Sequence, residues 1–298
     1  MVFSICLPVY RYDVRPLVDE LLRQAASLSP APEIIVFDDG SPATEAYGQE
    51  ELRTTPGIVY RELRENLGRA GVRNAMVGAA TRPWVLLMDA DGWPPASFLE
   101  TYLTKLRQLS ARESGTVMVG GRTYAPSPPL DSTLRLHWHY GHQRESRDLP
   151  RRRRDGWLGF QSNNFLAPVS LLKQYPFPEG HRGYGHEDTY WGQRMLRAGV
   201  PILHLDNPVV HLGLEPAGRF LDKQREAIRN LHLLRREHPW LRTRLTEITD
   251  HWSWAPMVAR LIPESTLQNY LSKRSAPNLL ALDLLKLRWW HELRPHGR

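Results

Sequence analysis

The segment 84–91, with the sequence WVLLMDAD, constrains the fold of this chain more than any other feature. Its five apolar residues are too few for a typical helix and precede Gly and Pro, so they predict a strand buried on both faces of a sheet. Asp89 and Asp91 then follow the carboxyl end of that strand, where open α/β sheets bind ligands. Two carboxylates that point the same way suit Mn2+ or Mg2+ completed by substrate phosphates. The plainer interpretation is a strand that ends in an acidic turn.

Strands and helices alternate through the first half of the chain. The apolar patterns predict strands over 3–9, 33–37, 58–63, 84–88 and 116–121, and helices over 14–28, 69–80 and 98–109. This alternation is typical of right-handed βαβ units and therefore of an α/β fold with a mostly parallel sheet. A helix over 187–198 and two short apolar runs follow, and the pattern from 218 onwards is helical and broken by prolines. We therefore expect a helical extension on an α/β core.

Composition narrows the class of protein. The single cysteine, Cys6, excludes an internal disulfide and a multi-cysteine zinc site, and we expect it to be buried. The first residues form an apolar strand rather than a signal peptide, and no run of 18 apolar residues occurs, so the expected compartment is the cytoplasm. The net charge is +7 and 34 of the 39 basic residues are Arg, which admits phosphorylated substrates, nucleic acid or anionic lipid as partners.

A second acidic pair, Asp38 and Asp39, also ends a predicted strand. Together the two strand ends outline one crevice, in which a carboxylate can accept hydrogen bonds from a ribose hydroxyl or a pyrimidine N–H. The structural alternative is a turn or a helix cap built by Asp39 or Ser41.

Seven motifs in a fixed order resemble those of the family-2 glycosyltransferases of GT-A fold. They are LPVYR (7–11), IIVFDDGS (34–41), NLGRAGVRNAMVGA (66–79), LLMDADGWPP (86–95), NNFLAPVSLL (163–172), GYGHEDTYWGQRMLRAG (183–199) and VVHLG (209–213). The resemblance implies a Rossmann-like, mostly parallel central sheet flanked by helices. We expect a catalytic core over 1–215, with a nucleotide-binding half (1–124) and an acceptor half (125–215), and a helical extension over 216–298.

The resemblance implies a nucleotide-sugar donor, usually UDP-linked, and a divalent cation, Mn2+ or Mg2+. In this family Asp39 would contact the base, Asp89 would lie by the ribose, and Asp91 would ligate the metal together with His211. A lone histidine beside apolar residues is otherwise more often a core residue.

Four further residues are implied on the donor side. Backbone at Pro8 and Val9 would help wall the uracil pocket. Arg69 and Arg73 lie where a basic residue of this family commonly meets the base or the phosphates, and we favour Arg73.

On the acceptor side, Gly183 and Gly185 precede Glu187 and Asp188, which open a predicted helix. The resemblance implies that Asp188 is the general base and that Glu187 binds the acceptor; the alternative is that both carboxylates only cap the helix. Three more residues fall where the family places sugar-contacting and acceptor-contacting side chains: Trp157, Asn163 and Asn164.

Three features are left with two interpretations each. Residues 125–155 predict a long functional loop, in which His137, His139 and His142 favour aromatic packing or acceptor contacts over a zinc site. The run 151–154, all Arg, predicts either a solvated loop or a mobile lid that meets the donor pyrophosphate or an anionic acceptor. The segment 278–293 is rich in Leu and Trp, so it fits a peripheral membrane contact near a lipid-linked acceptor, or docking on the core or in a homodimer.

The function that these residues favour is a metal-dependent inverting glycosyltransferase, which moves a sugar from a nucleotide sugar to an acceptor hydroxyl in polysaccharide, glycolipid or glycoprotein synthesis. A nucleotidyltransferase that makes nucleotide sugars is one alternative, but LPVYRYDVRP (7–16) has no glycine for a phosphate-binding loop. A basic nucleic-acid-binding protein is the other, but it leaves the strand-end aspartates unexplained, so we expect no nucleic-acid partner.

Overall fold

The computed structural model describes residues 2–180 and 183–293, which belong to two compact units. The first unit contains the described residues up to 123, 146–179 and 187–213. The second contains 124–145, 214–298 and 180–186, again as far as they are described. The segment that we expected to be the acceptor half, 125–215, is thus divided between the two units.

A sheet of seven strands forms the centre of the first unit, in the order β3-β2-β1-β4-β8-β6-β9. The strands are β1 (Phe3–Val9), β2 (Glu33–Asp38), β3 (Ile58–Glu62), β4 (Trp84–Met88), β6 (Val117–Val119), β8 (Asn164–Pro168) and β9 (Ile202–His204). Only β8 runs antiparallel to its neighbours, so the expected mostly parallel α/β sheet is confirmed. The order reverses between β1 and β4, and a crevice at the carboxyl ends of two such strands is the usual ligand site of an open α/β sheet.

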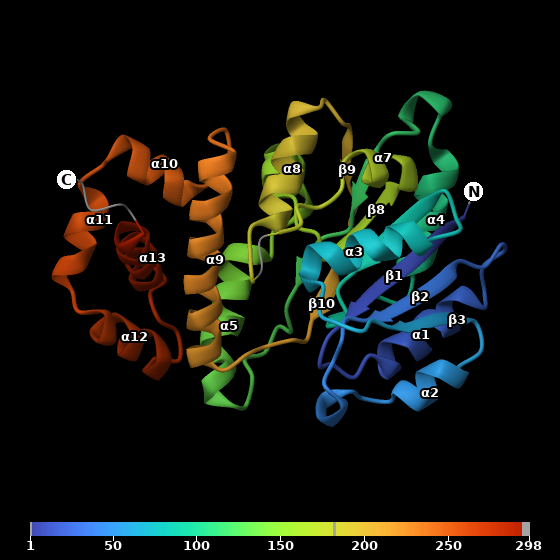
Figure 1. Ribbon diagram of the computed structural model, residues 1–298, viewed down its shortest axis with the longest axis horizontal. Coiled ribbons are helices and arrows are strands. Elements are labelled where there is room, and N and C mark those ends of the chain that lie inside the picture. Colours follow the sequence, from blue (N-terminus) through green and yellow to red (C-terminus); the bar gives the residue numbers. More distant parts are fainter. Residues whose placement is uncertain (1, 181–182, 294–298) are drawn as a thin grey trace. The chain divides into compact units, whose positions relative to one another are not determined.

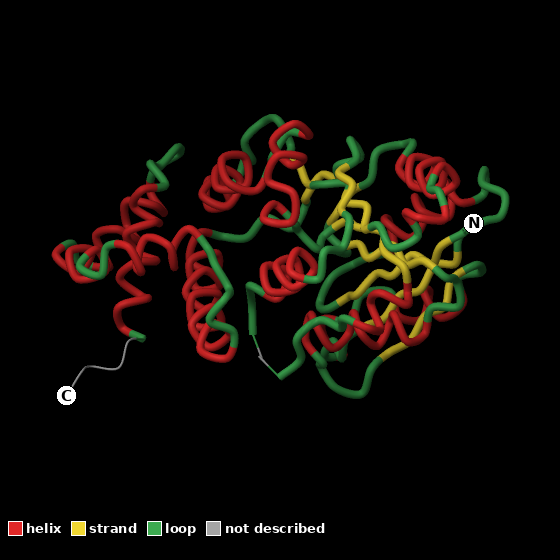
Figure 2. Tube along the Cα trace, turned by 90° about the horizontal axis from the view of Figure 1, so that it is seen from above, coloured by secondary structure: helices red, strands yellow, loops and turns green. Residues whose placement is uncertain are grey.

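The strands are buried on both faces because their alternate residues enter two different cores. Phe3, Ile5 and Leu7 of β1 pack with α1 (Arg15–Ala25) and α4 (Phe98–Gln108). Cys6 faces the other core, where its burial raises the pKa of the thiol. This second core also contains side chains of α3 (Gly68–Ala79), α7 (Val169–Gln174) and α8 (Glu187–Arg197). Figure 2 shows the strands of this unit lying between the helices.

A small second sheet links distant parts of the first unit. It contains β5 (Gly92–Trp93), β7 (Arg122–Thr123) and β10 (Val209–His211), in the order β5-β10-β7. In the antiparallel pair of β5 and β10, His211 lies opposite Gly92. The pairing therefore brings the VVHLG motif next to the residue that follows Asp91.

The expectation of a long loop over 125–155 is wrong. This segment contains η3 (Ser132–Leu134), α5 (Arg135–Tyr140), a π-helical turn (Gly141–Glu145) and α6 (Leu149–Asp155). In α6, the Asp148 carboxylate caps the helix by accepting a hydrogen bond from the Arg151 N–H (2.8 Å). Arginine is a good helix former, so a capped run of four arginines can be helical without being a solvated loop.

The second unit is largely helical. Its C-terminal part contains the helices α9 (Ala217–Glu237), α10 (Arg244–His251), α11 (Ala255–Val258), α12 (Glu264–Lys273) and α13 (Leu280–Glu292), with the short turn η6 (Ala259–Leu261) between α11 and α12. The segment 124–145 joins this unit through the ion pair of Arg144 with Asp283 (2.8 Å) and through Tyr140, whose ring packs against Phe220.

Helix α13 lies among α9, α10, α11 and α12 (Figure 1). Leu282, Leu285 and Trp289 are nearly fully buried, with exposed fractions of 1%, 0% and 2%. The helix is apolar around most of its circumference and packs on several sides, which fits the docking interpretation of 278–293 better than the peripheral membrane contact. Within residues 2–180 and 183–293, no helix has both the length and the hydrophobicity needed to cross a membrane.

Candidate functional site

Asp89 lies directly after β4 and is held by two arginines. Its Oδ1 accepts a hydrogen bond from Arg73 (2.9 Å), and its Oδ2 accepts one from Arg122 of β7 (3.3 Å). The Asp89 N–H donates to the backbone carbonyl of Asn163 (3.0 Å), and the Gly92 N–H donates to the Asp89 carbonyl (3.1 Å). These bonds hold the tight turn after β4, and the turn orients the side chains of Asp89 and Asp91.

Asp91 faces the histidine that the small sheet brings to it. The Asp91 Oδ1 lies 3.3 Å from His211 Nδ1, and the Leu212 N–H donates to the Asp91 carbonyl (2.8 Å). Burial raises the pKa of Asp91, but contact with His211 and the charge of Arg122 outweigh burial, so the net shift is downward. The carboxylate is therefore ionised at neutral pH.

Asp91 and His211 fit a divalent cation. Carboxylate oxygen and imidazole nitrogen are both ligands of Mn2+, and adjacent ligands of an octahedral ion with bonds of about 2.1 Å lie about 3 Å apart. The observed 3.3 Å separation agrees with that spacing. In the part of the chain that the structure describes, no group of three or more Asp, Glu, His or Cys side chains is placed to hold a metal.

Arg73, on α3, connects the end of β4 to the start of α8. Its side chain is 2% exposed and ion-pairs with Asp89 (2.9 Å) and with Glu187 (3.7 Å). Arg69, one turn earlier, is 47% exposed and lies 3.8 Å from Glu187. The structure thus brings both arginines to protein carboxylates, and their expected contact with the base or phosphates stays a prediction.

Glu187 and Asp188 form the first turn of α8, as expected. The Asp188 Oδ1 accepts a hydrogen bond from the Thr189 N–H (2.7 Å), so one carboxylate oxygen does contribute to the start of the helix. Burial, with a smaller effect of the neighbouring Glu187, raises the pKa of Asp188 to about 6. A carboxylate with a raised pKa is a stronger proton acceptor than an ordinary aspartate.

Asp39 has the structural role that the sequence left open. Its carboxylate accepts hydrogen bonds from the N–H groups of Leu67 (2.7 Å) and Gly68 (3.0 Å), at the start of α3. Burial raises the pKa of Asp39 to about 6 although both hydrogen bonds oppose that shift. Asp38 builds the turn instead, since its Oδ1 accepts from the Ser41 N–H (2.8 Å).

The predicted pocket wall lies beside this carboxylate. The Asp39 N–H donates to the Val9 carbonyl (2.8 Å), and Pro8 lies opposite Phe37 in the pairing of β1 with β2. The ends of β1 and β2 therefore meet as expected, whereas contact with a base stays a prediction.

Two of the three predicted acceptor-side residues are structural. Trp157 is 5% exposed, donates from its indole nitrogen to the Val200 carbonyl (2.7 Å) and packs edge-on against Trp191. Asn164 is fully buried, and its amide bonds to Tyr102 (2.6 Å) and to the carbonyls of Gly121 and Asn207. Both side chains are thus buried and bonded within the protein, and their expected contacts with a sugar or an acceptor stay predictions.

Asn163 differs from its neighbour. It is 2% exposed, and neither atom of its side-chain amide has a hydrogen-bond partner within the described residues. Buried amides are normally paired, so this side chain is able to bond a ligand or a water.

Arg152 of the arginine run and the three histidines have packing roles in the structure. Arg152 is buried, and its guanidinium donates to the carbonyls of Val119 (3.2 Å) and Leu205 (2.8 Å), which excludes a lid that consists of all four arginines. His137 packs on the ring of Phe220 and accepts a hydrogen bond from the Glu215 N–H (3.0 Å). His142 packs edge-on against Trp138, and His139 bonds to Gln143, in agreement with the packing interpretation.

Sequence reasoning missed three residues of the site. Arg122 forms an ion pair with Asp89, and the only sign of this role in the sequence is that Arg122 follows an apolar run. Tyr12 follows β1, and burial together with the charge of Asp91 raises the pKa of its phenol. Gly213 closes over Asp91: a Cβ at this position would lie 2.2 Å from Asp91 Oδ2.

Comparison with known proteins agrees with this arrangement. TarS 1-349 from S. aureus, in complex with UDP-GlcNAc, aligns over 98% of this chain and 91% of its own length, with 16% sequence identity and a TM-score of 0.52. The mannosyltransferase PcManGT from Pyrobaculum calidifontis, in complex with GDP-Man and Mn2+, aligns over 97% and 86%, with 15% identity and a TM-score of 0.60. At this identity the likeness shows the GT-A fold alone. A comparison with curated proteins finds no match.

The family is shown by a different comparison. The model of the glycosyl transferase family 2 matches residues 4–175, which is more than half of the chain. The match includes β1, β2 and β4, together with Asp39, Asp89 and Asp91 at their ends. The chain therefore belongs to glycosyltransferase family 2 and is a glycosyltransferase with the GT-A fold.

Proposed function

We propose that this glycosyltransferase is metal-dependent and inverting, and that it moves a sugar from a UDP-linked donor to the hydroxyl of a glycan or lipid-linked acceptor. The observation that carries the proposal is the convergence of Asp89, Asp91, Glu187 and His211 around Arg73 and Arg122. Nucleotide sugars are the donors bound by TarS and PcManGT, and the latter binds one together with Mn2+.

On the donor side, the ends of β1 and β2 would receive the nucleotide. Asp39 would accept a hydrogen bond from the base, and the backbone at Pro8 and Val9 would form part of the wall of the base pocket. Asp89 would accept a hydrogen bond from a ribose hydroxyl. Arg73 and Arg122 hold Asp89 in place through both of its oxygens. Asp91 and His211 would hold a divalent cation, which supplies positive charge to the departing nucleotide diphosphate.

On the acceptor side, Asp188 would remove the proton from the acceptor hydroxyl. The hydroxyl oxygen then forms its bond to the anomeric carbon while the bond to the diphosphate oxygen breaks on the opposite face, which inverts the configuration. One carboxylate in this place suffices for a single displacement, whereas a retaining glycosidase needs two. Glu187, paired with Arg73, would orient the acceptor hydroxyl next to Asp188.

The test compares two variants in transfer and in binding. Asp91→Ala and Asp188→Asn are both expected to abolish transfer. Calorimetric titration with UDP should show that Asp91→Ala loses the Mn2+-dependent part of the affinity, whereas Asp188→Asn keeps it because a general base contributes mainly in the transition state. An equal loss of UDP affinity in both variants, or affinity of the unaltered enzyme that EDTA leaves unchanged, would contradict the proposed roles.

The donor is identified in the same system. A thermal-shift screen of UDP-sugars and GDP-sugars, each with and without Mn2+, should give the largest rise in melting temperature for a UDP-sugar, since a ligand that binds only the native state stabilises it. A larger shift with GDP-sugars would overturn the choice of nucleotide without affecting the assignment to the family.

A further inference from the structure

Exposed apolar side chains concentrate in one short segment of the second unit. Of the 18 large hydrophobic residues that are exposed within the described part of the chain, six lie between 252 and 262. They are Trp252 (49% exposed), Trp254 (58%), Met257 (61%), Val258 (44%), Leu261 (80%) and Ile262 (38%). We call these six residues the 252–262 patch. Single exposed apolar residues are normal, but six of them within eleven residues of chain indicate a binding surface.

The segment that carries the patch is anchored to the second unit by its buried residues and by α13. Pro256 and Ala259, which alternate with the exposed residues, are buried. The Arg288 side chain of α13 donates to the carbonyls of Arg260 (3.1 Å) and Ile262 (3.4 Å). The segment therefore packs on the unit through one side, and its other side presents two tryptophans and four aliphatic or thioether side chains to solvent.

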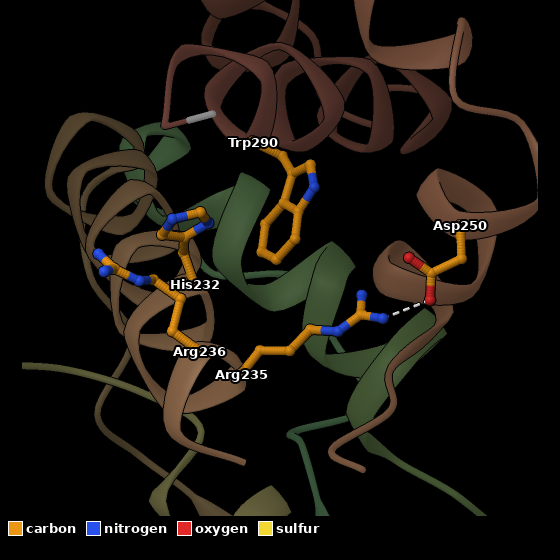
Figure 3. A pocket seen from close by; sticks show the side chains of 5 residues that line it. All are labelled: His232, Arg235, Arg236, Asp250 and Trp290. Carbon is orange, nitrogen blue, oxygen red and sulfur yellow. Dashed lines mark hydrogen bonds and ion pairs between the residues drawn. The ribbon is translucent and has the colours of Figure 1, made fainter. Parts of the chain in front are cut away.

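The charge near the patch is positive. Residues 251–263 contain Arg260 and no Asp or Glu, and over 214–293 Lys and Arg outnumber Asp and Glu by 13 to 9. A pocket of about 230 Å3 lies in the same unit and is lined by His232, Arg235, Arg236, Asp250 and Trp290 (Figure 3). Asp250 is ion-paired with Arg235, so the charge of Arg236 is not balanced by a carboxylate of the lining and the lining is positive overall. Asp250, which lines this pocket, precedes Trp252 by two residues, so their Cα atoms lie at most about 7 Å apart.

We infer that the 252–262 patch docks the protein on an anionic lipid surface. Tryptophan rings favour the headgroup level, aliphatic side chains favour the acyl boundary, and Arg favours anionic headgroups. A second copy of this chain fits the same surface less well, because an isologous contact would bring together two surfaces that are both positively charged. The inference does not depend on the proposed donor or metal, and it would place the enzyme beside acceptors that are carried by lipid.

The test is co-sedimentation of the full-length protein with two kinds of vesicle, phosphatidylcholine alone and phosphatidylcholine mixed with phosphatidylglycerol. We expect sedimentation with the mixed vesicles, weakened by salt, and at least about a tenfold loss of binding in the variant W252S/W254S/L261S. Leu130→Ser is the matched control, since Leu130 is fully exposed in the same unit but lies outside the patch. Leu261→Ser alone removes the most exposed member and cannot create a cavity in the core.

Each outcome decides the proposal. It is overturned if the unaltered protein does not sediment with mixed vesicles, or if both patch variants sediment as well as the Leu130→Ser protein. If the unaltered protein is a dimer that the triple variant converts to monomer, with no vesicle binding in either, the patch is an interface between copies and the lipid proposal is wrong. Calorimetric UDP binding, measured in parallel, should be the same in all of these proteins, so failure here is distinguishable from failure of the proposed transfer reaction.

Discussion

Asp39 and Asp188 both have a pKa raised to about 6, and in both of them burial is the main cause. Their surroundings nevertheless differ. Both oxygens of Asp39 accept backbone hydrogen bonds that favour the ionised form, whereas Asp188 has one such bond and an acidic neighbour, Glu187. Both carboxylates are therefore expected to change ionisation state near pH 6, and Asp188 is the one of the two that is proposed to take part in the reaction.

The raised pKa of Asp188 links stability to pH. The folded protein binds this proton more tightly than the unfolded chain, whose Asp pKa is about 3.9, so the stability present at low pH is lost as pH rises through about 6. Asp188→Asn should therefore melt at a higher temperature than the unaltered protein at pH 7 to 8, and the difference should vanish near pH 4. Differential scanning calorimetry across this range measures it. A constant difference at every pH would show that Asp188 does not titrate as proposed.

The same ionisation controls the proposed transfer reaction. Below the pKa of Asp188, the rate should fall about tenfold for each pH unit, because only the ionised carboxylate accepts a proton. Initial rates at saturating donor and acceptor, from pH 5 to pH 8, test this. A profile that stays flat through pH 6 would remove Asp188 from the role of base.

The buried Arg73 predicts a large loss of stability on truncation. Arg73→Ala leaves Asp89 and Glu187 without this partner, and breaking a buried ion pair in this way costs about 3 kcal/mol. Arg69→Ala is the control, because Arg69 lies on the same helix but is half exposed, and its loss should cost less than about 1 kcal/mol. Urea unfolding of both variants gives the comparison, and equal effects would contradict the structural role of Arg73.

At the scale of elements, the small sheet and the helix α6 explain what the linear motifs do not. The pairing of β5 with β10 joins residues that are more than a hundred positions apart, and it sets the distance between Asp91 and His211. Helix α6 places Arg152 under the ends of β6 and β9, where it bonds to the carbonyls of Val119 and Leu205. Both contacts are non-local, so neither can be read from hydrophobic periodicity.

Gly213 tests the geometry of the small sheet. In Gly213→Ala the new Cβ would meet Asp91 Oδ2 at 2.2 Å, so the carboxylate must move. Metal-dependent activity should then fall on the order of tenfold to hundredfold, since small displacements in a site are costly. Gly218→Ala is the control: it lies in α9 with open space around the Cβ and should keep full activity. Full activity in both variants would show that the position of Asp91 is not critical.

Helix α6 predicts unequal effects within the arginine run. Arg152→Ser removes the side-chain donor of the buried Leu205 carbonyl and one of the two donors of the Val119 carbonyl, so it should lower the free energy of unfolding by about 2 kcal/mol. Arg153→Ser changes an exposed side chain on the same helix and should shift it by no more than about 0.5 kcal/mol. Chemical unfolding distinguishes the two, and a stable Arg152→Ser protein with weakened donor binding would restore the interpretation as a lid.

At the scale of the whole molecule, the chain consists of two compact units with separate architectures. The first carries the sheet and every residue of the proposed site, and the second is built around α13. The second unit is not only the C-terminal extension that the sequence predicts. It also takes in 124–145, held by Arg144 and Tyr140, because a helix as apolar as α13 needs packing partners on several sides.

Removal of α13 tests this architecture. Truncation after Pro277 deletes Leu282, Leu285 and Trp289, which are core residues of the second unit. We expect the truncated protein to lose helical circular dichroism well beyond the residues deleted and to become sensitive to proteolysis between 214 and 277. A truncated protein that keeps a cooperative transition and resists the protease would show that α13 is dispensable for this unit.

The sequence by itself determined the α/β class, the strand-end aspartates and the membership in a family, because apolar periodicity and local motifs are properties of neighbouring residues. It predicted β4, the turn at Asp89 and the start of α8 for the same reason. Only the tertiary structure decided that Trp157, Asn164 and Arg152 are buried in the scaffold, that Arg122 and Gly213 surround the aspartates, and that the exposed apolar surface is the 252–262 patch rather than α13. Burial and long-range pairing depend on which segments meet in space, and that is a property of the packed chain.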